Sequence, residues 1–212
     1  MATRTTTKTE ITVPAIDIRH ITLKIVGDSP LIMHKWSHKA KQEMLDKQMK
    51  KAKKGREAKD PVADFIESIY WLDGEPEEKT EEGFTKAIEN GAKFGFPTVA
   101  FKASAVAAGY RAGVTKDKVS TNGAFHIDGE FVEIQGATPE MREDMVRVGM
   151  GTADIRYRGE FRGWFAEITV KYNATAISAE QIVNLFNLGG FACGIGEWRP
   201  EKGGTSGMFH VE

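Results

Sequence analysis

An α+β fold is predicted for this chain from the order of its elements and from two alternating periodicities. Segments in which apolar residues recur at every second position, typical of strands, alternate with segments of helical spacing. They come in the order strand, helix, strand, strand, helix, strand. A hydrophobic content of 41% over 212 residues is ordinary for a soluble globular protein and supports a core.

The first two elements of this order are a strand and an alanine-rich helix. From His20 to Val26, isoleucine and leucine alternate with histidine, threonine and lysine, and this period of two predicts a strand that Gly27–Pro30 ends. In residues 97–111 the apolar side chains fall at helical spacing, and Pro97 stands where a helix can start. We therefore predict a helix over this segment.

The remaining elements are short strands and one amphipathic helix. Ser178 and Gln181 have the spacing of a capping box, and Gly189-Gly190 is expected to end the helix that they start. Residues 138–149 are interpreted as either a short helix or a loop. Residues 156–158 and 164–172 are expected to pair antiparallel. The predicted strands are 124–127, 131–134, 156–158, 164–172 and 208–211.

The β-α-β-β-α-β order is that of a ferredoxin-like, or RRM-like, core, whose open sheet face binds single-stranded RNA in many modules. Residues 1–18 are polar and rich in threonine, and predict a flexible N-terminal arm. We expect a single domain over residues 19–212. Within it, residues 34–95 are predicted to form a large helical insertion, only partly packed.

Composition excludes several classes of protein. No apolar run is long enough for a transmembrane helix, the N-terminus lacks the apolar region of a signal peptide, and one cysteine fits a reducing cytoplasm. We expect that cysteine, Cys193, to be a buried core residue. The net charge of −1 hides a basic segment at 34–59, with ten lysines or arginines, and an acidic segment at 73–82. A local basic surface therefore remains compatible with this composition.

The strongest functional signal is the C-terminal glycine-rich segment. Seven glycines lie between Gly189 and Gly207, together with Trp198, Arg199 and Lys202. Glycine permits positive φ or close approach of a ligand, and the tryptophan and cations suit a base and phosphates. The alternative is a tight structural turn in which Trp198 packs on the sheet. The segment lacks the spacing of a nucleotide-binding P-loop.

Further candidates for phosphate or base contacts lie elsewhere in the chain, and each has a structural alternative. Trp36 among cations could stack a base or anchor a solvated helix, and the arginines at 156–162 could meet phosphates or pair with Glu167. The lysine at 102 could assist a phosphate at a helix start, or be a plain surface residue. These candidates are His34, Lys35, Trp36, Lys39, Lys102, Arg111, Arg156, Arg158 and Arg162, beside Gly194, Gly196, Trp198, Arg199 and Lys202 in the glycine-rich segment.

Catalysis and metal binding have weak signals in the sequence. His34 and His38 are four residues apart, but no third ligand accompanies them. No triad of nucleophile, base and acid can be assembled from the sequence order. Asp128 and Asp154 are acids near predicted strand ends, where turn residues are the ordinary interpretation. We expect no catalytic residue, no metal and no cofactor.

Three stretches, in order, resemble the RAMP superfamily, repeat-associated proteins that include the guide-RNA backbone subunits of CRISPR effector complexes. They are residues 21–33, an opening strand and apolar turn; residues 96–105, with proline, a small residue, lysine and an alanine-rich helix; and the C-terminal helix with its glycine-rich loop. The Gly196–Pro200 loop is also similar to one in a group of uncharacterised bacteriophage proteins. The resemblance implies a ferredoxin-like core, binding to single-stranded RNA or DNA, and side-by-side assembly. The histidine or loop aspartate of some RAMP nucleases has no assigned counterpart here.

We therefore predict a non-enzymatic, RAMP-like protein of bacteriophage type, in the cytoplasm of a bacterial host, that coats single-stranded RNA or DNA as a homo-oligomer or filament. Its partners would be the strand and a CRISPR effector or phage recombination component, with no membrane. One alternative is a protein–protein module that mimics a CRISPR backbone subunit. In it, the acidic segment at 73–82 would meet a basic partner. Another alternative is a RAMP-type ribonuclease.

Overall fold

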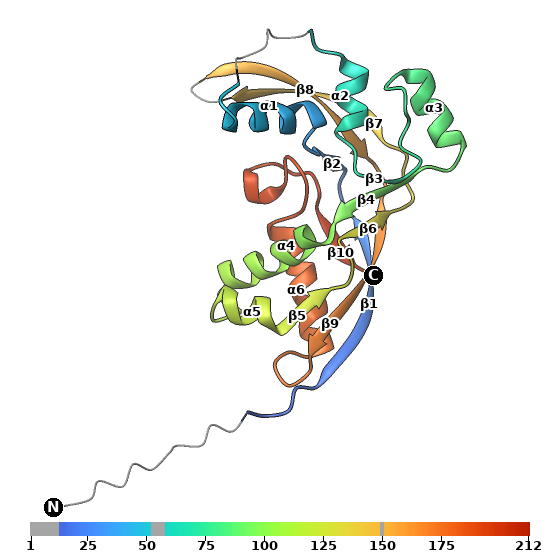
Figure 1. The fold of residues 1–212 in the computed structure, drawn as a ribbon. Helices are drawn as coiled ribbons and strands as arrows, with labels where there is room; N and C mark the ends of the chain where they lie inside the picture. The colour runs from blue at the N-terminus through green and yellow to red at the C-terminus, as the bar shows by residue number, and fades with distance from the viewer. Residues whose placement is uncertain (1–12, 52–57, 149–150) are drawn as a thin grey trace, which may run out of the picture.

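The computed structural model describes residues 13–51, 58–148 and 151–212, so most of the predicted arm lies outside the described residues. The described part is a mixed α+β fold with several antiparallel sheets and six α-helices (Figure 1). Its helices are α1 (His38–Gln48), α2 (Pro61–Glu67), α3 (Glu81–Glu89), α4 (Thr98–Arg111), α5 (Lys118–Ala124) and α6 (Ala179–Ala192), with a 3-10 turn η1 (Pro200–Lys202). Its strands are β1 (Ile18–Gly27), β2 (Leu31–Met33), β3 (Trp71–Asp73), β4 (Lys93–Pro97), β5 (Phe125–Ile127), β6 (Phe131–Ile134), β7 (Glu140–Val148), β8 (Thr152–Phe161), β9 (Phe165–Asn173) and β10 (Phe209–Val211). Within the described ranges, no helix has both the length and the apolar character needed to cross a bilayer.

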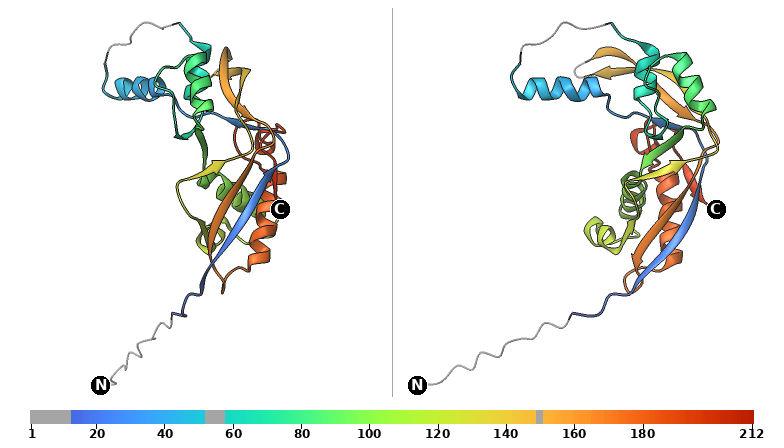
Figure 2. Two further views of the ribbon diagram at one scale, coloured as in Figure 1. Left: turned by 90° about the vertical axis from the view of Figure 1, so that its right-hand side faces the viewer. Right: turned by 45° about the vertical axis from the view of Figure 1, so that its right-hand side comes forward.

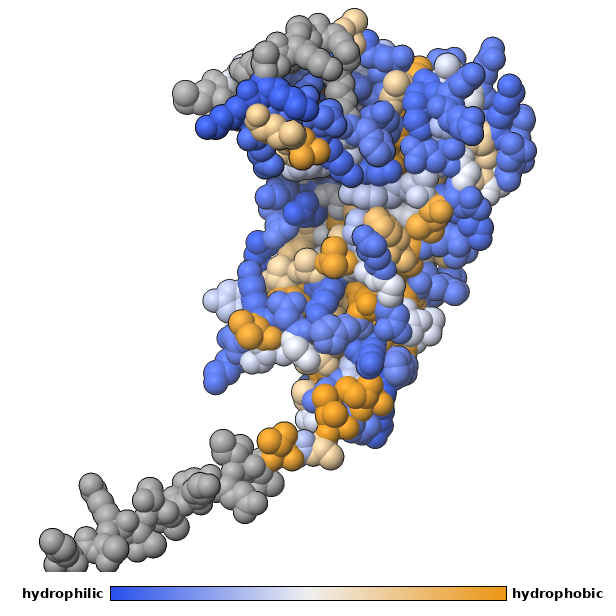
Figure 3. All heavy atoms as spheres, in the orientation of Figure 1, coloured by the Kyte–Doolittle hydropathy of each residue, from blue (hydrophilic) through white to orange (hydrophobic). Residues whose placement is uncertain are grey.

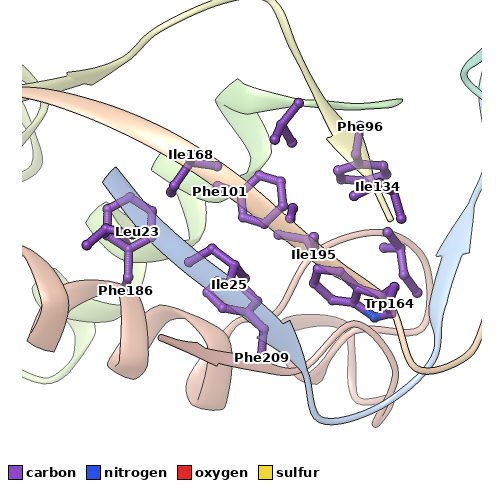
Figure 4. Packing of buried hydrophobic residues seen from close by; sticks show 14 of the residues in the cluster. Leu23, Ile25, Phe96, Phe101, Ile134, Trp164, Ile168, Phe186, Ile195 and Phe209 are labelled. Carbon is purple, nitrogen blue, oxygen red and sulfur yellow. The ribbon is translucent and has the colours of Figure 1, made fainter. Parts of the chain in front are cut away.

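The main sheet has the strand order β10-β1-β9-β5, and every neighbouring pair is antiparallel. Along the chain, these strands and two helices follow the order β1, α4, β5, β9, α6, β10. The period-two prediction for β1 is confirmed, because Leu23 and Ile25 are buried whereas the intervening Thr22 and Lys24 are exposed. The helices α4 and α6 pack against each other on the face that these buried side chains share (Figures 1 and 4).

The core under this sheet is built from aromatic and branched side chains. Phe101 of α4 lies edge-on to the ring of Trp164, with ring centroids 6.5 Å apart, and 5.6 Å from Phe209 of β10. Phe186 of α6 meets Phe125 of β5 at 5.9 Å. Figure 4 shows core rings such as Phe101, Phe186 and Phe209 lying between the sheet and the helices. Burial of such side chains contributes about 1.5–3 kcal/mol each to stability.

A second part of the molecule is built from two separate stretches of chain. Residues 31–97 and 131–161 supply sheets of order β2-β8-β7 and β3-β4-β6, together with α1, α2 and α3. The bridge between Gln135 and Phe165 joins this part to the main sheet. In Figure 2 the molecule is curved, with α1 at one end of the concave side and α4 and α5 at the other.

Two sequence predictions about strands are wrong. Residues 138–149 contain the strand β7 and not a helix or a loop, because β7 pairs with β8 over nine residues of each strand. The segment around Arg156 and Arg158 lies in β8, which pairs with β7 and β2 and not with residues 164–172. Between β8 and β9 the chain passes from one sheet to the other through Gly163, whose φ is 67°. The next residue, Trp164, is fully buried.

The prediction that Gly189-Gly190 ends the last helix is also wrong, because α6 continues to Ala192. These glycines lie within α6 and allow it to pack closely against α4 and β10. A Cβ on Gly189 would lie 2.7 Å from the Ser104 hydroxyl of α4, and one on Gly190 would lie 1.8 Å from the Phe209 carbonyl oxygen of β10. The capping box of Ser178 and Gln181 is confirmed at the other end of the helix.

Gly190→Ala should therefore destabilise the protein, although alanine is the better helix former by about 1 kcal/mol. Because a backbone atom blocks the added Cβ, we expect a decrease of about 1–3 kcal/mol or more in the free energy of unfolding. Gly123→Ala in α5 is the matched control: nothing lies within 4 Å of its Cβ, so this change should be neutral or stabilising. Urea unfolding of both variants tests this, and equal effects would contradict it.

Candidate functional site

One groove lies between the start of α4 and the segment that follows α6. It measures about 530 Å³ and opens on the concave side of the molecule, where Figure 3 shows a recess below α1. One wall is the small-residue face of α4, and the opposite wall is residues 194–201 of the glycine-rich segment. The lining residues include His34, Tyr70, Val99, Ala100, Ala103, Lys118, Gly194, Gly196, Glu197, Arg199 and Glu201.

The α4 wall follows from the helical spacing of its residues. Phe101, Ala105 and Ala108 are buried toward the core, so Ala100 and Ala103 are left on the side that faces the groove. Because these side chains are small, the wall can be approached closely. Val99 stands at the start of the helix and is 69% exposed, an apolar side chain without cover.

The glycine-rich segment is folded by contacts within the protein. The amide of Glu197 donates to the Ile32 carbonyl (3.0 Å), and that of Gly207 donates to the Pro30 carbonyl (2.8 Å). Gly196 has a φ of 76°, and a Cβ there would lie 2.5 Å from the Ile32 oxygen. Glycine is therefore required at position 196, where the segment meets β2. The tight turn that the sequence offered as an alternative to a ligand site explains this glycine.

Arg199 of this segment and Arg111 of α4 share one carboxylate, that of Glu201. Arg199 donates twice to Glu201, at 3.0 and 2.9 Å, and once to the Gly196 carbonyl. Arg111 of α4 donates to the same Glu201 at 2.7 Å. Burial raises the pKa of Glu201, but these two guanidiniums outweigh it and hold the pKa below its usual value. Two positive charges against one negative charge leave this cluster with a net positive charge beside the groove.

A buried network of ion pairs lies behind the groove, on one face of the β7–β8 hairpin. Arg158 donates to Asp144 at 2.9 Å, and the two side chains are only 7% and 5% exposed. Arg142 donates to Asp144 at 2.9 Å and lies 3.5 Å from Glu160. Burial raises the pKa of Asp144, but hydrogen bonds from Arg142, Arg158 and Trp198 lower it further than that. The carboxylate is therefore charged and fully engaged.

The network reaches the groove through His34, Glu197 and Trp198. The Arg158 Nε donates to His34 Nδ1 at 3.4 Å, and the Arg158 guanidinium lies 3.7 Å from Glu197. Burial, followed by the positive charge of Arg158, lowers the pKa of His34, so its imidazole is neutral near pH 7. Trp198 has a left-handed backbone with a φ of 52°, which costs a residue other than glycine roughly 1–3 kcal/mol. Trp198 is 41% exposed at the edge of this cluster.

The structure brings some of the predicted residues together. His34, Gly194, Gly196 and Arg199 line the groove, Arg158 and Trp198 lie directly behind it, and Arg111 joins it through Glu201. These seven predicted residues therefore form one region, although His34 and Arg199 are 165 positions apart in the chain.

The other predicted residues lie elsewhere. Lys202 is exposed in η1, next to the groove residue Glu201, and Trp36 is exposed before α1. Lys39 lies in α1, and its side chain is outside the described residues. The remaining cations have partners: Arg156 with Asp154 (2.9 Å), Arg162 with Glu160 (3.0 Å), Lys35 with Glu75 (3.9 Å) and Lys102 with the Asn122 carbonyl (2.7 Å).

Several residues of this region carry no signal in the sequence. Asp144 could not be predicted because both faces of β7 carry polar residues, so the strand has no apolar alternation, and Glu160 lies on the neighbouring strand β8. Tyr70 and Lys118 enter the groove from segments that are 48 positions apart. No local pattern could have joined them. In the described part of the chain, no group of three or more potential metal ligands occurs.

Arg158→Met tests the buried network. Removal of the guanidinium leaves Asp144 buried with fewer partners, so we expect a decrease of about 3–5 kcal/mol in the free energy of unfolding. Arg147→Met is the control, since Arg147 lies on the same hairpin and is exposed. Chemical denaturation should separate the two variants, and an Arg158→Met protein as stable as the control would contradict the assignment.

His34 should make stability depend on pH. Because its pKa is lowered in the folded state, the unfolded chain binds the proton first as the pH falls below about 6.5. The contribution of His34 is complete above that pH and diminishes below it, by no more than about 1.4 kcal/mol per pH unit. His34→Gln should flatten this part of the curve of unfolding free energy against pH. Superimposable curves would show that His34 is not responsible.

Comparisons with known proteins give little. No family model matches the chain, and no curated protein matches it. Among solved structures, a crystal structure of Cmr6 from Pyrococcus furiosus is similar over 93% of this chain and 100% of that chain, with 9% sequence identity and a TM-score of 0.47. A similarity of this size assigns neither a fold nor a function to the chain.

Proposed function

We propose that this protein binds single-stranded nucleic acid in the groove between α4 and the glycine-rich segment, and that it does so without catalysis. The observation that carries the proposal is the composition of the groove. It combines an apolar wall of small residues, the aromatic ring of Tyr70 and the cations Lys118 and Arg199 on one concave surface, beside the acids Glu197 and Glu201. Single-strand binders use these same components, aromatic faces for bases and cations for the backbone.

The apolar side of the groove suits bases. Tyr70 is held by ring contacts with Phe96 (5.8 Å) and Phe131 (5.7 Å), so its position is fixed before a ligand arrives. Burial, with Glu197 nearby, raises the pKa of Tyr70 and keeps the phenol neutral. A base that stacks on an aromatic side chain contributes about 1–3 kcal/mol. Val99 and Ala100 offer further apolar surface to a base or a sugar.

The cationic side suits phosphates. Lys118 lines the groove, and its Nζ lies 5.3 Å from the Tyr110 ring with no carboxylate within 4 Å among the described residues. The pair of arginines on Glu201 adds a net positive charge. The helix α1 lies at the other end of the concave side (Figure 2), and its residues Lys41 and Lys47 are exposed. Against these cations, Glu197 is an acid whose nearest described partner, Arg158, is 3.7 Å away.

The architecture supports the RAMP-like part of the proposal. The chain order β1, α4, β5, β9, α6, β10 matches the ferredoxin-like order of elements. Together with the motifs at 21–33, 96–105 and 194–207, it favours a RAMP-like core with a large insertion. Assembly side by side along a strand, and a setting in a phage or CRISPR system, are proposed from that resemblance alone.

A clean test must avoid residues that hold the fold. Replacement of Arg199 and Trp198 would also break the interactions with Glu201 and Asp144, so weaker binding there would be ambiguous. Val99→Glu introduces a negative charge into the groove at an exposed position. Val114→Glu makes the same change outside the groove, and both valines are 69% exposed.

Fluorescence anisotropy with labelled single-stranded DNA and RNA over a salt series should then give three results. The unmodified protein should bind more weakly as salt rises. Val99→Glu should weaken binding at least tenfold, about 1.4 kcal/mol, and Lys118→Gln by a smaller factor. Val114→Glu should bind like the unmodified protein. Absence of binding at low salt, or equal effects of the two glutamates, would reject the proposal and favour the protein–protein alternative.

A further inference from the structure

One acid of the groove accepts no hydrogen bond from a side chain of the described residues. Glu197 lines the groove, its side chain is 42% exposed, and its nearest cation, the Arg158 guanidinium, is 3.7 Å away. The hydrogen bonds of Arg158 go instead to Asp144 and His34. Glu201, the other acid that lines the groove, accepts three hydrogen bonds from two arginines. The oxygens of Glu197 are therefore open to a ligand, whereas those of Glu201 are occupied.

A carboxylate weakens a surface that binds phosphates. Because like charges repel, Glu197 lowers the attraction of the groove for a nucleic-acid backbone. A carboxylate can, however, accept hydrogen bonds from the amine and N–H groups of a base. Contacts to base edges give selectivity, which phosphate contacts do not. The position of Glu197 in this groove therefore suits selection of a base.

His34 places a hydrogen-bond donor beside this acid. Both side chains line the groove, and Arg158 contacts both, at 3.4 Å from His34 Nδ1 and 3.7 Å from Glu197. Since Nδ1 accepts from Arg158, we assign the hydrogen of the neutral ring to Nε2. Nε2 points away from Arg158, and within the described ranges it has no hydrogen-bond partner.

The ring of Tyr70 lies in the same groove and can stack a base next to these two groups. Burial, and then the charge of Glu197, raise the pKa of Tyr70, which places that carboxylate near the phenol. The groove measures about 530 Å³, within the range of about 300–1,000 Å³ that is usual for small-ligand sites. One base with its sugar therefore fits.

We infer that the groove selects guanine, with Tyr70 stacking the base and with His34 and Glu197 contacting its base-pairing edge. The inference deepens the proposed function and rests on it, because it names the base that the same groove prefers. Guanine presents one acceptor, O6, followed by two donors, N1–H and the N2 amine. This order matches one donor on His34 and two acceptor oxygens on Glu197. Two parallel N–H groups on one carboxylate form a bidentate pair, which adds geometric selectivity to energy.

The other bases do not match this set of groups. Adenine presents a donor followed by an acceptor, the reverse of the order that His34 and Glu197 require. Cytosine presents one donor, its N4 amine, followed by two acceptors that would face the carboxylate. Uracil and thymine match at O4 and N3–H, but their O2 would lie against an oxygen of Glu197. Each mismatch leaves a polar group unpaired or repelled, and such groups are the basis of strong discrimination.

The first test needs no change in the protein. It uses fluorescence anisotropy with labelled oligothymidine strands that carry one central guanine, adenine, hypoxanthine or 7-deazaguanine. The strand with guanine should bind about tenfold more tightly than the strand with adenine, as a bidentate contact predicts. Hypoxanthine lacks the N2 amine and should fall between them. 7-Deazaguanine keeps the whole base-pairing edge and should bind like guanine.

Glu197→Gln then tests the residue. Glutamine replaces one acceptor with an amine donor, so the preference for guanine over adenine should fall to about twofold or less. The strand with adenine should bind no more weakly than before, because a negative charge has left the groove. A merely structural role of Glu197 would weaken both strands together. The control is Glu89→Gln at the exposed end of α3, which should leave the preference unchanged.

The outcomes separate this inference from the proposed function. If no strand binds at low salt, the proposed function fails and the inference fails with it. If Val99→Glu weakens binding but guanine and adenine bind equally, the groove binds nucleic acid without selecting a base, and the inference alone is wrong. A guanine preference that survives Glu197→Gln, or that 7-deazaguanine loses, also overturns it. If guanosine monophosphate binds as tightly as the strand with guanine, the occupant is a mononucleotide and the inference about a strand is wrong.

Discussion

The buried ion pair of Arg158 and Asp144 is the interaction on which the arrangement of the groove depends. Both side chains are almost completely removed from water, so the two charges stabilise each other, and removal of Arg158 leaves Asp144 buried with Arg142 and Trp198 as its remaining partners. Arg158 also reaches His34 and Glu197, and Asp144 also accepts from Trp198. The β7–β8 hairpin, the end of β2 and the glycine-rich segment are therefore fixed relative to one another by one cluster of charges.

The glycine-rich segment is held in place by this cluster of charges and also by hydrogen bonds of its own backbone. Its glycines bring its backbone against β2, and amides such as those of Ile195 and Glu197 donate to the protein itself. These amides are consequently not free for a phosphate. In the proposed function a strand would meet side chains, Arg199 and Lys118 among them, on a surface whose shape the glycines set. This changes the role that the sequence suggested for the glycines, from a cradle for a ligand to a support for the groove.

Charged side chains around the groove and on the exposed face of the main sheet are paired in different ways. Around the groove, arginines are shared among carboxylates, which leaves a modest positive charge beside an apolar wall. On the exposed face of the main sheet, the ion pairs among the described residues are simple surface pairs, Lys24 with Glu212 and His210 with Asp28.

The sequence by itself determined the local elements whose signals are short-range. The alternation in β1, the start of α4 after Pro97 and the capping box at Ser178 follow from contacts within a few residues, and each was predicted. Only the tertiary structure decided that α6 continues through Gly190, because the reason is the carbonyl of Phe209 on another element. It likewise decided which cations are engaged. Arg158 resembles a surface arginine in sequence, and it becomes a buried structural residue because β7, which has no apolar period, brings Asp144 beside it.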